Sequence, residues 1–301
     1  MSKFLKVFGK IALAIIIFFV LTSIASFVVL LGAILVEYGS DMGRLVEEAG
    51  TMELEANTSE LFETLALTNG LMIVQCLCMI AAVWIMWVAF ERRSGWGLGW
   101  KRERWFREGA AGSLWGIIFM TVCFLVVWVA GGIEVTGYGG EGIMRDLALA
   151  IVLFVLVGIS EELLNRGYIQ GLIRHHYGKT IAIAVTSLIF AAMHLANANV
   201  LQSPWPLVNL MLAGVLMGVA REVTGSLWAP IGIHFTWNLF QGNVYGFEVS
   251  GNDFGGSIVH AEAIGKDFLS GGAFGAEGSM ITALILVGAI LFMRAYYAKL
   301  K

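Results

Sequence analysis

A pair of adjacent carboxylates, Glu161 and Glu162, interrupts a long apolar stretch of the sequence. Residues four apart share one face of a helix, so Arg166 can pair with Glu162. Two neighbouring carboxylates in a medium of low dielectric constant do not ionise independently. If Arg166 keeps Glu162 charged, Glu161 is the member of the pair that can accept and return a proton, as a general base must.

Two histidines and an asparagine occur in other apolar stretches. Phe190 lies one helical turn before His194 and can shield it from lipid, and His234 lies one turn before Asn238. His194 could share a water molecule with Glu161, while His234 and Asn238 could donate hydrogen bonds to an oxyanion. A base, a water-orienting group and oxyanion donors are the set that hydrolysis of an amide requires.

Each motif alone also has a simpler interpretation, either a structural ion pair or an interhelical hydrogen bond. Charged groups at the centre of a membrane cost about 2.5–3.5 kcal/mol each on insertion scales, and so indicate function. Counting about 1.5 Å of rise per residue from the expected inner helix ends puts Glu161, His194 and Asn238 at similar depths, near 20 Å. This agreement favours one site over three unrelated contacts.

The composition identifies the medium around these residues. Of 301 residues, 58% are hydrophobic and 14% are charged, and the mean hydropathy is +0.80. Soluble domains are about 45–50% apolar and about 25% charged. The composition excludes a disordered chain, a secreted disulfide scaffold and a nucleic-acid binder that acts through bulk positive charge. The three cysteines lie in apolar runs without zinc-finger spacing.

We expect an all-α polytopic membrane protein with about eight transmembrane helices, since roughly 20 apolar residues span a bilayer. The expected spans are 11–36, 71–90, 111–130, 147–172, 180–198, 205–220, 226–242 and 279–298. Of the 19 Lys and Arg residues, only Arg44, Arg145 and Lys266 then fall on the side opposite the N-terminus. The positive-inside rule makes the basic side, with both termini, cytoplasmic. The expected location is the plasma membrane of a bacterium.

The chain divides into three expected parts. Residues 1–146 hold three transmembrane helices, an acidic outer loop and a basic inner loop, and the first helix is expected to be a retained anchor. Residues 147–242 hold the four helices that carry the motifs. Residues 243–301 hold a Gly-rich outer loop and the last helix. We expect the acidic segment 37–70 to form a helical hairpin or an interface helix, and the loop 243–278 to be functional or mobile.

All three motifs occur in order on separate expected spans, and in this respect Leu147–Phe240 resembles the CPBP family. These are the CAAX-protease and bacteriocin-processing intramembrane proteases, which include the type II CAAX prenyl endopeptidases. The resemblance implies an endopeptidase active within the membrane, in which a Glu and a His activate water and a His and an Asn stabilise the oxyanion. The residues it assigns are catalytic Glu161, His194, His234 and Asn238, with Glu162, Arg166 and Phe190 in support.

The sequence leaves two versions of the chemistry open. The resemblance covers both a metalloprotease and a metal-free glutamate mechanism. No His-Glu-x-x-His helix is present, yet Glu161, His194 and His234 could ligate zinc with a fourth position open. We favour the metal-free version.

The expected partners are the lipid bilayer and a peptide or protein substrate with a membrane-associated segment. Prenylated CAAX tails, peptide pheromones, bacteriocin leaders and the tails of membrane proteins all fit, and nucleic acid does not. Two alternatives come from other functional classes. One is a non-catalytic membrane scaffold or immunity protein, and the other is a proton-coupled transporter, because Glu–His clusters also relay protons.

Overall fold

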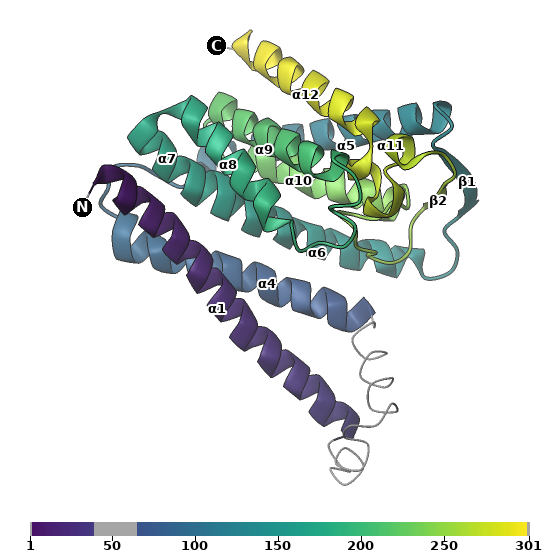
Figure 1. Ribbon diagram of the computed structural model, residues 1–301, viewed down its shortest axis with the longest axis horizontal. Helices are drawn as coiled ribbons and strands as arrows, with labels where there is room; N and C mark the ends of the chain where they lie inside the picture. The colour runs from purple at the N-terminus through teal and green to yellow at the C-terminus, as the bar shows by residue number, and fades with distance from the viewer. Residues whose placement is uncertain (1, 39–64, 300–301) are drawn as a thin grey trace. The chain divides into compact units, whose positions relative to one another are not determined.

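The computed structural model describes residues 2–38 and 65–299, and these form two compact units (Figure 1). The first unit is Met1–Ala89 and the second is Phe90–Lys301. Most of the acidic segment expected to form a hairpin or an interface helix, including Arg44, lies outside the described residues. The three-part division drawn from the sequence stays a prediction.

The first unit is a pair of long apolar helices. Helix α1 spans Lys3–Tyr38, and α4 spans Leu65–Met86 and continues as the π-helix η1, Trp87–Glu91. The two helices pack against each other, and Ala14 and Ala82 are fully buried. Small side chains at the interface of two apolar helices let the helix backbones approach closely, as is common in membranes.

The second unit holds the three motifs and a short sheet. Its elements are η2 (Arg102–Arg104), α5 (Trp105–Val129), β1 (Ile133–Tyr138), α6 (Ile143–Glu162), η3 (Leu163–Ile169), α7 (Gln170–Tyr177), α8 (Lys179–Met193), α9 (Trp205–Thr224), α10 (Trp228–Leu239), η4 (Phe240–Val244), β2 (Val259–Ala263), α11 (Asp267–Ser270), η5 (Gly272–Phe274), η6 (Ala276–Gly278) and α12 (Met280–Ala298).

The expectation of an all-α polytopic membrane fold is confirmed. Within the described ranges, six helical stretches are long and apolar enough to cross a bilayer. They are Lys3–Val36, Leu67–Glu91, Arg102–Val129, Ile143–Tyr177, Trp205–Thr224 and Met280–Ala298. Helix α8, with 15 residues, and α10, with 12, are shorter. The count of eight spans and the side on which the termini lie stay predictions.

Glycines allow a close helix contact in the second unit, that of α5 with α10. A Cβ atom on Gly232 of α10 would lie 2.5 Å from the carbonyl oxygen of Gly109 in α5, and one on Gly116 would meet Thr236. No larger side chain fits such a crossing without displacing one helix. Helix α10, which carries the third motif, is thereby fixed against α5.

Helix α9 packs against both α8 and α12. On the α8 side, a Cβ atom on Gly214 would lie 2.8 Å from the Cα of Ser187. The spacing of Gly214 and Gly218 predicts this close packing. The two glycines bring α9 against the helix that ends at the second motif.

Three contacts with a common four-residue step join η3 and α7 to α9. We call this set the α7–α9 ladder. Its donor–acceptor distances lie between 2.9 and 3.2 Å. Its members are Arg166 with the carbonyl of Gly214, Gln170 with the carbonyl of Gly218, and Arg174 with the carboxylate of Glu222.

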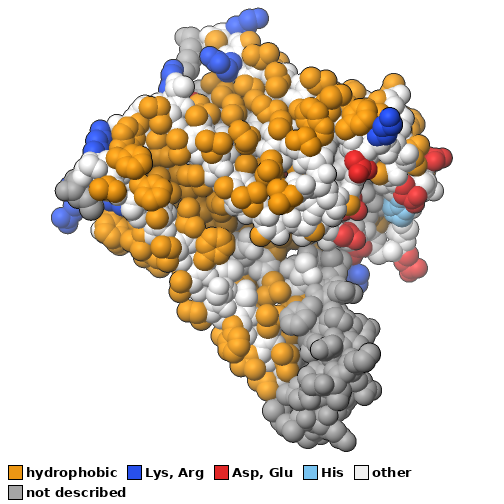
Figure 2. Space-filling model, viewed as in Figure 1, with side chains coloured by type: hydrophobic (Ala, Val, Ile, Leu, Met, Phe, Trp, Pro, Cys, Tyr) orange, Lys and Arg blue, Asp and Glu red, His pale blue; other side chains and the backbone are white. Residues whose placement is uncertain are grey.

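The Gly-rich segment 243–278, which the sequence predicts to be an outer loop and which we call the outer segment, is folded. Strand β2 pairs antiparallel with β1, from Ile133 opposite Ala263 to Tyr138 opposite Val259. Figure 1 shows β1, β2 and α11 together at one end of the second unit. In Figure 2, the Asp and Glu side chains gather at that end, and much of the rest of the visible surface is apolar.

Candidate active site

The two adjacent glutamates end helix α6, and the π-helix η3 begins directly after them. A π-helical turn inside a helix is rare and occurs often at functional sites. Across this turn the Nη1 of Arg166 donates to the Oε1 of Glu162 at 3.0 Å, and both side chains are fully buried. The ion pair predicted from the spacing is therefore present.

Arg166 has two further partners, which a buried cation requires. Its Nη2 donates to the carbonyl oxygen of Gly214 in α9 at 3.2 Å. Its guanidinium carbon lies 4.5 Å from the centroid of the Phe190 ring, within the range of a cation–π contact. The pair with Glu162 is thus fixed to α9 and to α8 as well as within its own helix.

His234 connects the third motif to both glutamates. Its Nδ1 lies 3.0 Å from the same Oε1 of Glu162 that Arg166 contacts, and its Nε2 lies 4.0 Å from the Oε2 of Glu161. An ionised Glu162 can only accept, so Nδ1 carries the proton and Nε2 faces Glu161. The 4.0 Å separation is too long for a direct hydrogen bond.

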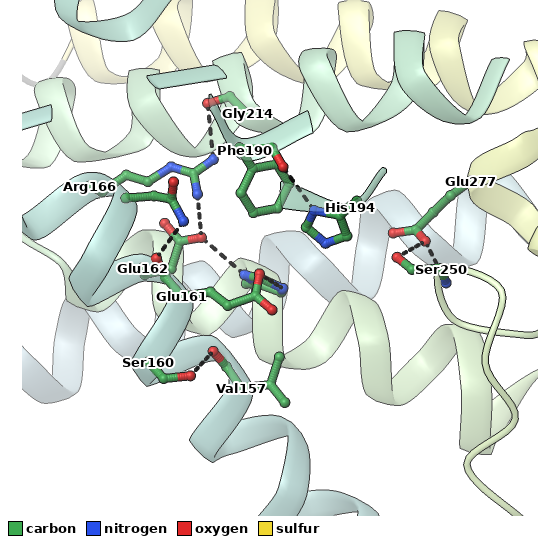
Figure 3. A network of polar contacts seen from close by, with 12 residues as sticks. Val157, Ser160, Glu161, Glu162, Arg166, Phe190, His194, Gly214, Ser250 and Glu277 are labelled. Carbon is green, nitrogen blue, oxygen red and sulfur yellow. Dashed lines mark hydrogen bonds and ion pairs between the residues drawn. The ribbon is translucent and has the colours of Figure 1, made fainter. Parts of the chain in front are cut away.

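Phe190 occupies the centre of the cluster. Its ring centroid lies 4.7 Å from that of His194 and 6.2 Å from that of His234, and Arg166 lies over its face. Figure 3 shows Phe190 among Glu162, Arg166 and His194. The Phe190 ring thus contacts His194 and also residues from the other two motifs, and its shielding of His194 from lipid stays a prediction.

His194 follows the last residue of α8 and caps its C-terminal end. Its Nδ1 lies 2.8 Å from the carbonyl oxygen of Phe190, one turn earlier. A carbonyl only accepts, so this contact places the proton on Nδ1 and leaves Nε2 open. The His194 side chain is half-buried.

Asn238 follows His234 by one turn on α10, and its side chain is 7% exposed. Among residues 2–38 and 65–299, no group lies within hydrogen-bond distance of its amide. The amide is therefore available to a bound molecule, as the predicted role of oxyanion donor requires.

Two contacts in this region were not identified from the sequence. The Nδ2 of Asn165 donates to the backbone carbonyl of Glu161 at 3.0 Å, and Gly214 supplies a carbonyl to Arg166. The four-residue spacing of Asn165 from Glu161 was a usable signal. The contact with Gly214 carries no such signal, because it joins residues 48 positions apart.

The zinc alternative was tested against the donor set. Within the described part of the chain, no three His, Cys, Asp or Glu side chains are placed so that they could hold a metal ion. The Nδ1 atoms of both His194 and His234 contact protein oxygens, so Nε2 is the one nitrogen of each ring that a metal ion could bind. As the structure places them, Glu161, His194 and His234 do not form such a group.

Residues 142–240 match the model of a family described as type II CAAX prenyl endopeptidase Rce1-like. The match covers about a third of the chain and includes all three motifs. A curated relative, an uncharacterized 24.3 kDa protein of Escherichia coli, is 34% identical over 99 residues, which are 32% of this chain and 44% of the relative. The chain therefore spans less than half the length of that relative.

The family match confirms the resemblance predicted from the motifs. Together with the six candidate spans, it identifies a multi-pass integral membrane protein.

Proposed function

We propose that the protein is an intramembrane endopeptidase in which Glu161 activates a water molecule for attack on a peptide bond. The observation that carries this proposal is the convergence of the three motifs. Glu161 lies 4.0 Å from His234, and a buried pair of Glu162 and Arg166 holds His234 in place. A single water molecule with two hydrogen bonds of about 2.8 Å can bridge such a separation.

In the proposed reaction, the carboxylate of Glu161 removes a proton from water while the water oxygen bonds to the substrate carbonyl carbon. His194 orients that water through its open Nε2. The carbonyl oxygen becomes an oxyanion, which Asn238 and His234 stabilise by donating hydrogen bonds. When the tetrahedral intermediate collapses, the C–N bond breaks and Glu161 returns the proton to the leaving amine.

The second ring nitrogen of His234 suits this residue to donating a hydrogen bond to the oxyanion. Its Nδ1 is committed to Glu162, so only Nε2 can face the reacting atoms. To donate from Nε2 the ring must carry two protons, and the carboxylates of Glu161 and Glu162 compensate the resulting positive charge. Arg166 then serves to keep Glu162 ionised and correctly oriented.

For the substrate, we propose a peptide or protein with a membrane-associated segment, either a CAAX-type tail or a peptide such as a bacteriocin leader. The family match supports the first of these. The burial of the cluster among apolar helices supports both, because only a segment that partitions into the bilayer brings its peptide bond to that level.

The test is peptide cleavage by purified protein in lipid nanodiscs. Internally quenched membrane peptides, with and without a prenylated CAAX tail, would report hydrolysis. General-base catalysis contributes about 10²–10⁴-fold, so Glu161→Gln should lose activity by at least that factor. Glu141→Gln, at an exposed carboxylate of the same unit, should cleave like the wild type. A correctly inserted Glu161→Gln protein with wild-type activity would refute the proposed mechanism.

A further inference from the structure

The outer segment contains a tight turn with an unusual backbone. Val249 and Asn252 exchange both backbone hydrogen bonds, and the two residues between them have positive φ angles, 52° at Ser250 and 81° at Gly251. Two positive φ angles define a type I′ turn, whose first position favours Asn, Asp or Gly. A serine there is strained, so its surroundings must hold it in place.

Glu277 holds that serine by two hydrogen bonds. Its Oε2 accepts from the backbone N–H of Ser250 at 2.8 Å and from the Ser250 hydroxyl at 2.6 Å (Figure 3). Glycine would be unstrained at this position but has no side chain to make the second bond, which gives a reason for the serine. We call Glu277 and the turn Val249–Asn252 the outer latch.

The backbone at Glu277 is itself fixed to helix α9. The Nδ2 of Asn209, a buried residue in α9, donates to the backbone carbonyls of Glu277 and of Ser279, both at 2.7 Å. The outer latch is therefore anchored to the same helix that contacts Arg166.

The outer latch contacts the segment that carries His194. The Nδ2 of Asn197 donates to the carbonyl of Ser250 at 3.0 Å, and the backbone N–H of Asn197 donates to the carbonyl of His194 at 3.0 Å. Gly251 lies so close to the carbonyl of Ala198 that a Cβ atom there would collide with it. Since α8 ends at Met193, these contacts help to fix the non-helical backbone after His194, together with the burial of Val200 beside Phe190.

We propose that Glu277 is a positioning residue of the candidate active site, which holds the Val249–Asn252 turn against Asn197 and thereby fixes the backbone of His194. This inference rests on the proposed function. Glu277 lies outside residues 142–240, so the family match does not cover it. It acts through Ser250 and Asn197 and does not touch the reacting atoms.

The kinetic test compares Glu277→Ala, Glu277→Gln and the control Glu248→Ala. Glu248 is exposed in the same outer segment, and its side chain has no partner among the described residues. A misplaced catalytic group costs up to about 100-fold, so Glu277→Ala should lower kcat by about 10- to 100-fold and leave KM within about twofold. Glu277→Gln keeps an oxygen that accepts from Ser250 and should restore most of kcat.

Coupling to His194 separates positioning from general destabilisation. In a His194→Ala background, Glu277→Ala should cause less than about a twofold further loss, because residues that act through one another are not additive. Equal losses in both backgrounds, or a Glu277→Ala enzyme that matches Glu248→Ala, would overturn the proposal.

Hydrogen–deuterium exchange gives a readout that does not depend on proteolysis. In Glu277→Ala, peptides covering residues 194–200 should exchange at least about tenfold faster than in the wild type, while peptides from α9 stay unchanged. Ser250→Ala, which keeps the backbone bond, provides a milder variant if Glu277→Ala does not insert. Unchanged exchange in both variants would refute the outer latch. If Glu277→Ala shows this faster exchange but the wild type cleaves nothing, the proposed function would be refuted instead.

Discussion

Replacing Arg166 by Met tests whether the buried ion pair stabilises the fold around the site. Both side chains of the pair are fully buried, so Arg166→Met leaves the carboxylate of Glu162 in apolar surroundings without its cation. The variant also loses the hydrogen bond to the Gly214 carbonyl and the cation–π contact with Phe190. Breaking a buried pair by removing one partner costs about 3–5 kcal/mol.

We expect the free energy of unfolding to fall by that amount. The unfolding equilibrium constant then rises by about two to four powers of ten. Denaturant titration of the purified protein in mixed micelles would measure it. Arg145→Met is the matched control, since the Arg145 side chain is 80% exposed and lies 3.4 Å from Asp146. Exposed pairs contribute about 0–1 kcal/mol.

A double variant separates stability from catalysis. Glu162→Met with Arg166→Met removes both buried charges, and apolar replacement of a buried pair is often neutral or stabilising. The double variant should therefore regain most of the stability that Arg166→Met loses. Proteolysis should still be absent, because the Nδ1 of His234 has lost its acceptor. If Arg166→Met lost no more stability than Arg145→Met, the reasoning from burial would be refuted.

Three further outcomes follow from the site and the packing. Asn238→Ala should lower kcat by about 10²–10³-fold with little change in KM, measured on a quenched peptide, as expected for an oxyanion donor. Gly232→Ala should destabilise the fold by about 1–3 kcal/mol in a denaturant titration, while Gly140→Ala, with nothing within 4 Å of the added carbon, should not. Proteolysis should persist in chelator with zinc well below one atom per chain by elemental analysis, and loss of activity that added zinc restores would contradict the metal-free version.

The membrane character and the core of the site could be predicted from the sequence because both depend on local spacing. Apolar runs define helices in lipid, and a four-residue step places Glu162 beside Arg166 and Phe190 beside His194. The expected span 147–172 lies within the continuous helical stretch from α6 through α7.

Contacts between distant segments could not be predicted in the same way. Arg166 and His234 contact the same oxygen of Glu162. Because His234 lies 72 positions after Glu162, no local sequence pattern predicts this contact. The π-helical turn after Glu162 likewise follows from tertiary packing and not from residue type. The outer segment 243–278 was expected to be functional or mobile, and one of the contacts that fold it joins Ser250 to Glu277, 27 residues later.

The common four-residue step of the α7–α9 ladder restricts how these helices can move. Because its three contacts repeat at the same interval, any small slide of α9 along η3 and α7 strains all of them together. Only a displacement of one full turn, about 5.4 Å, would bring donors and acceptors back into register. We therefore expect motion at this interface to be stepwise, and at rest the pair of Arg174 and Glu222 shares one fixed alignment with the buried Arg166.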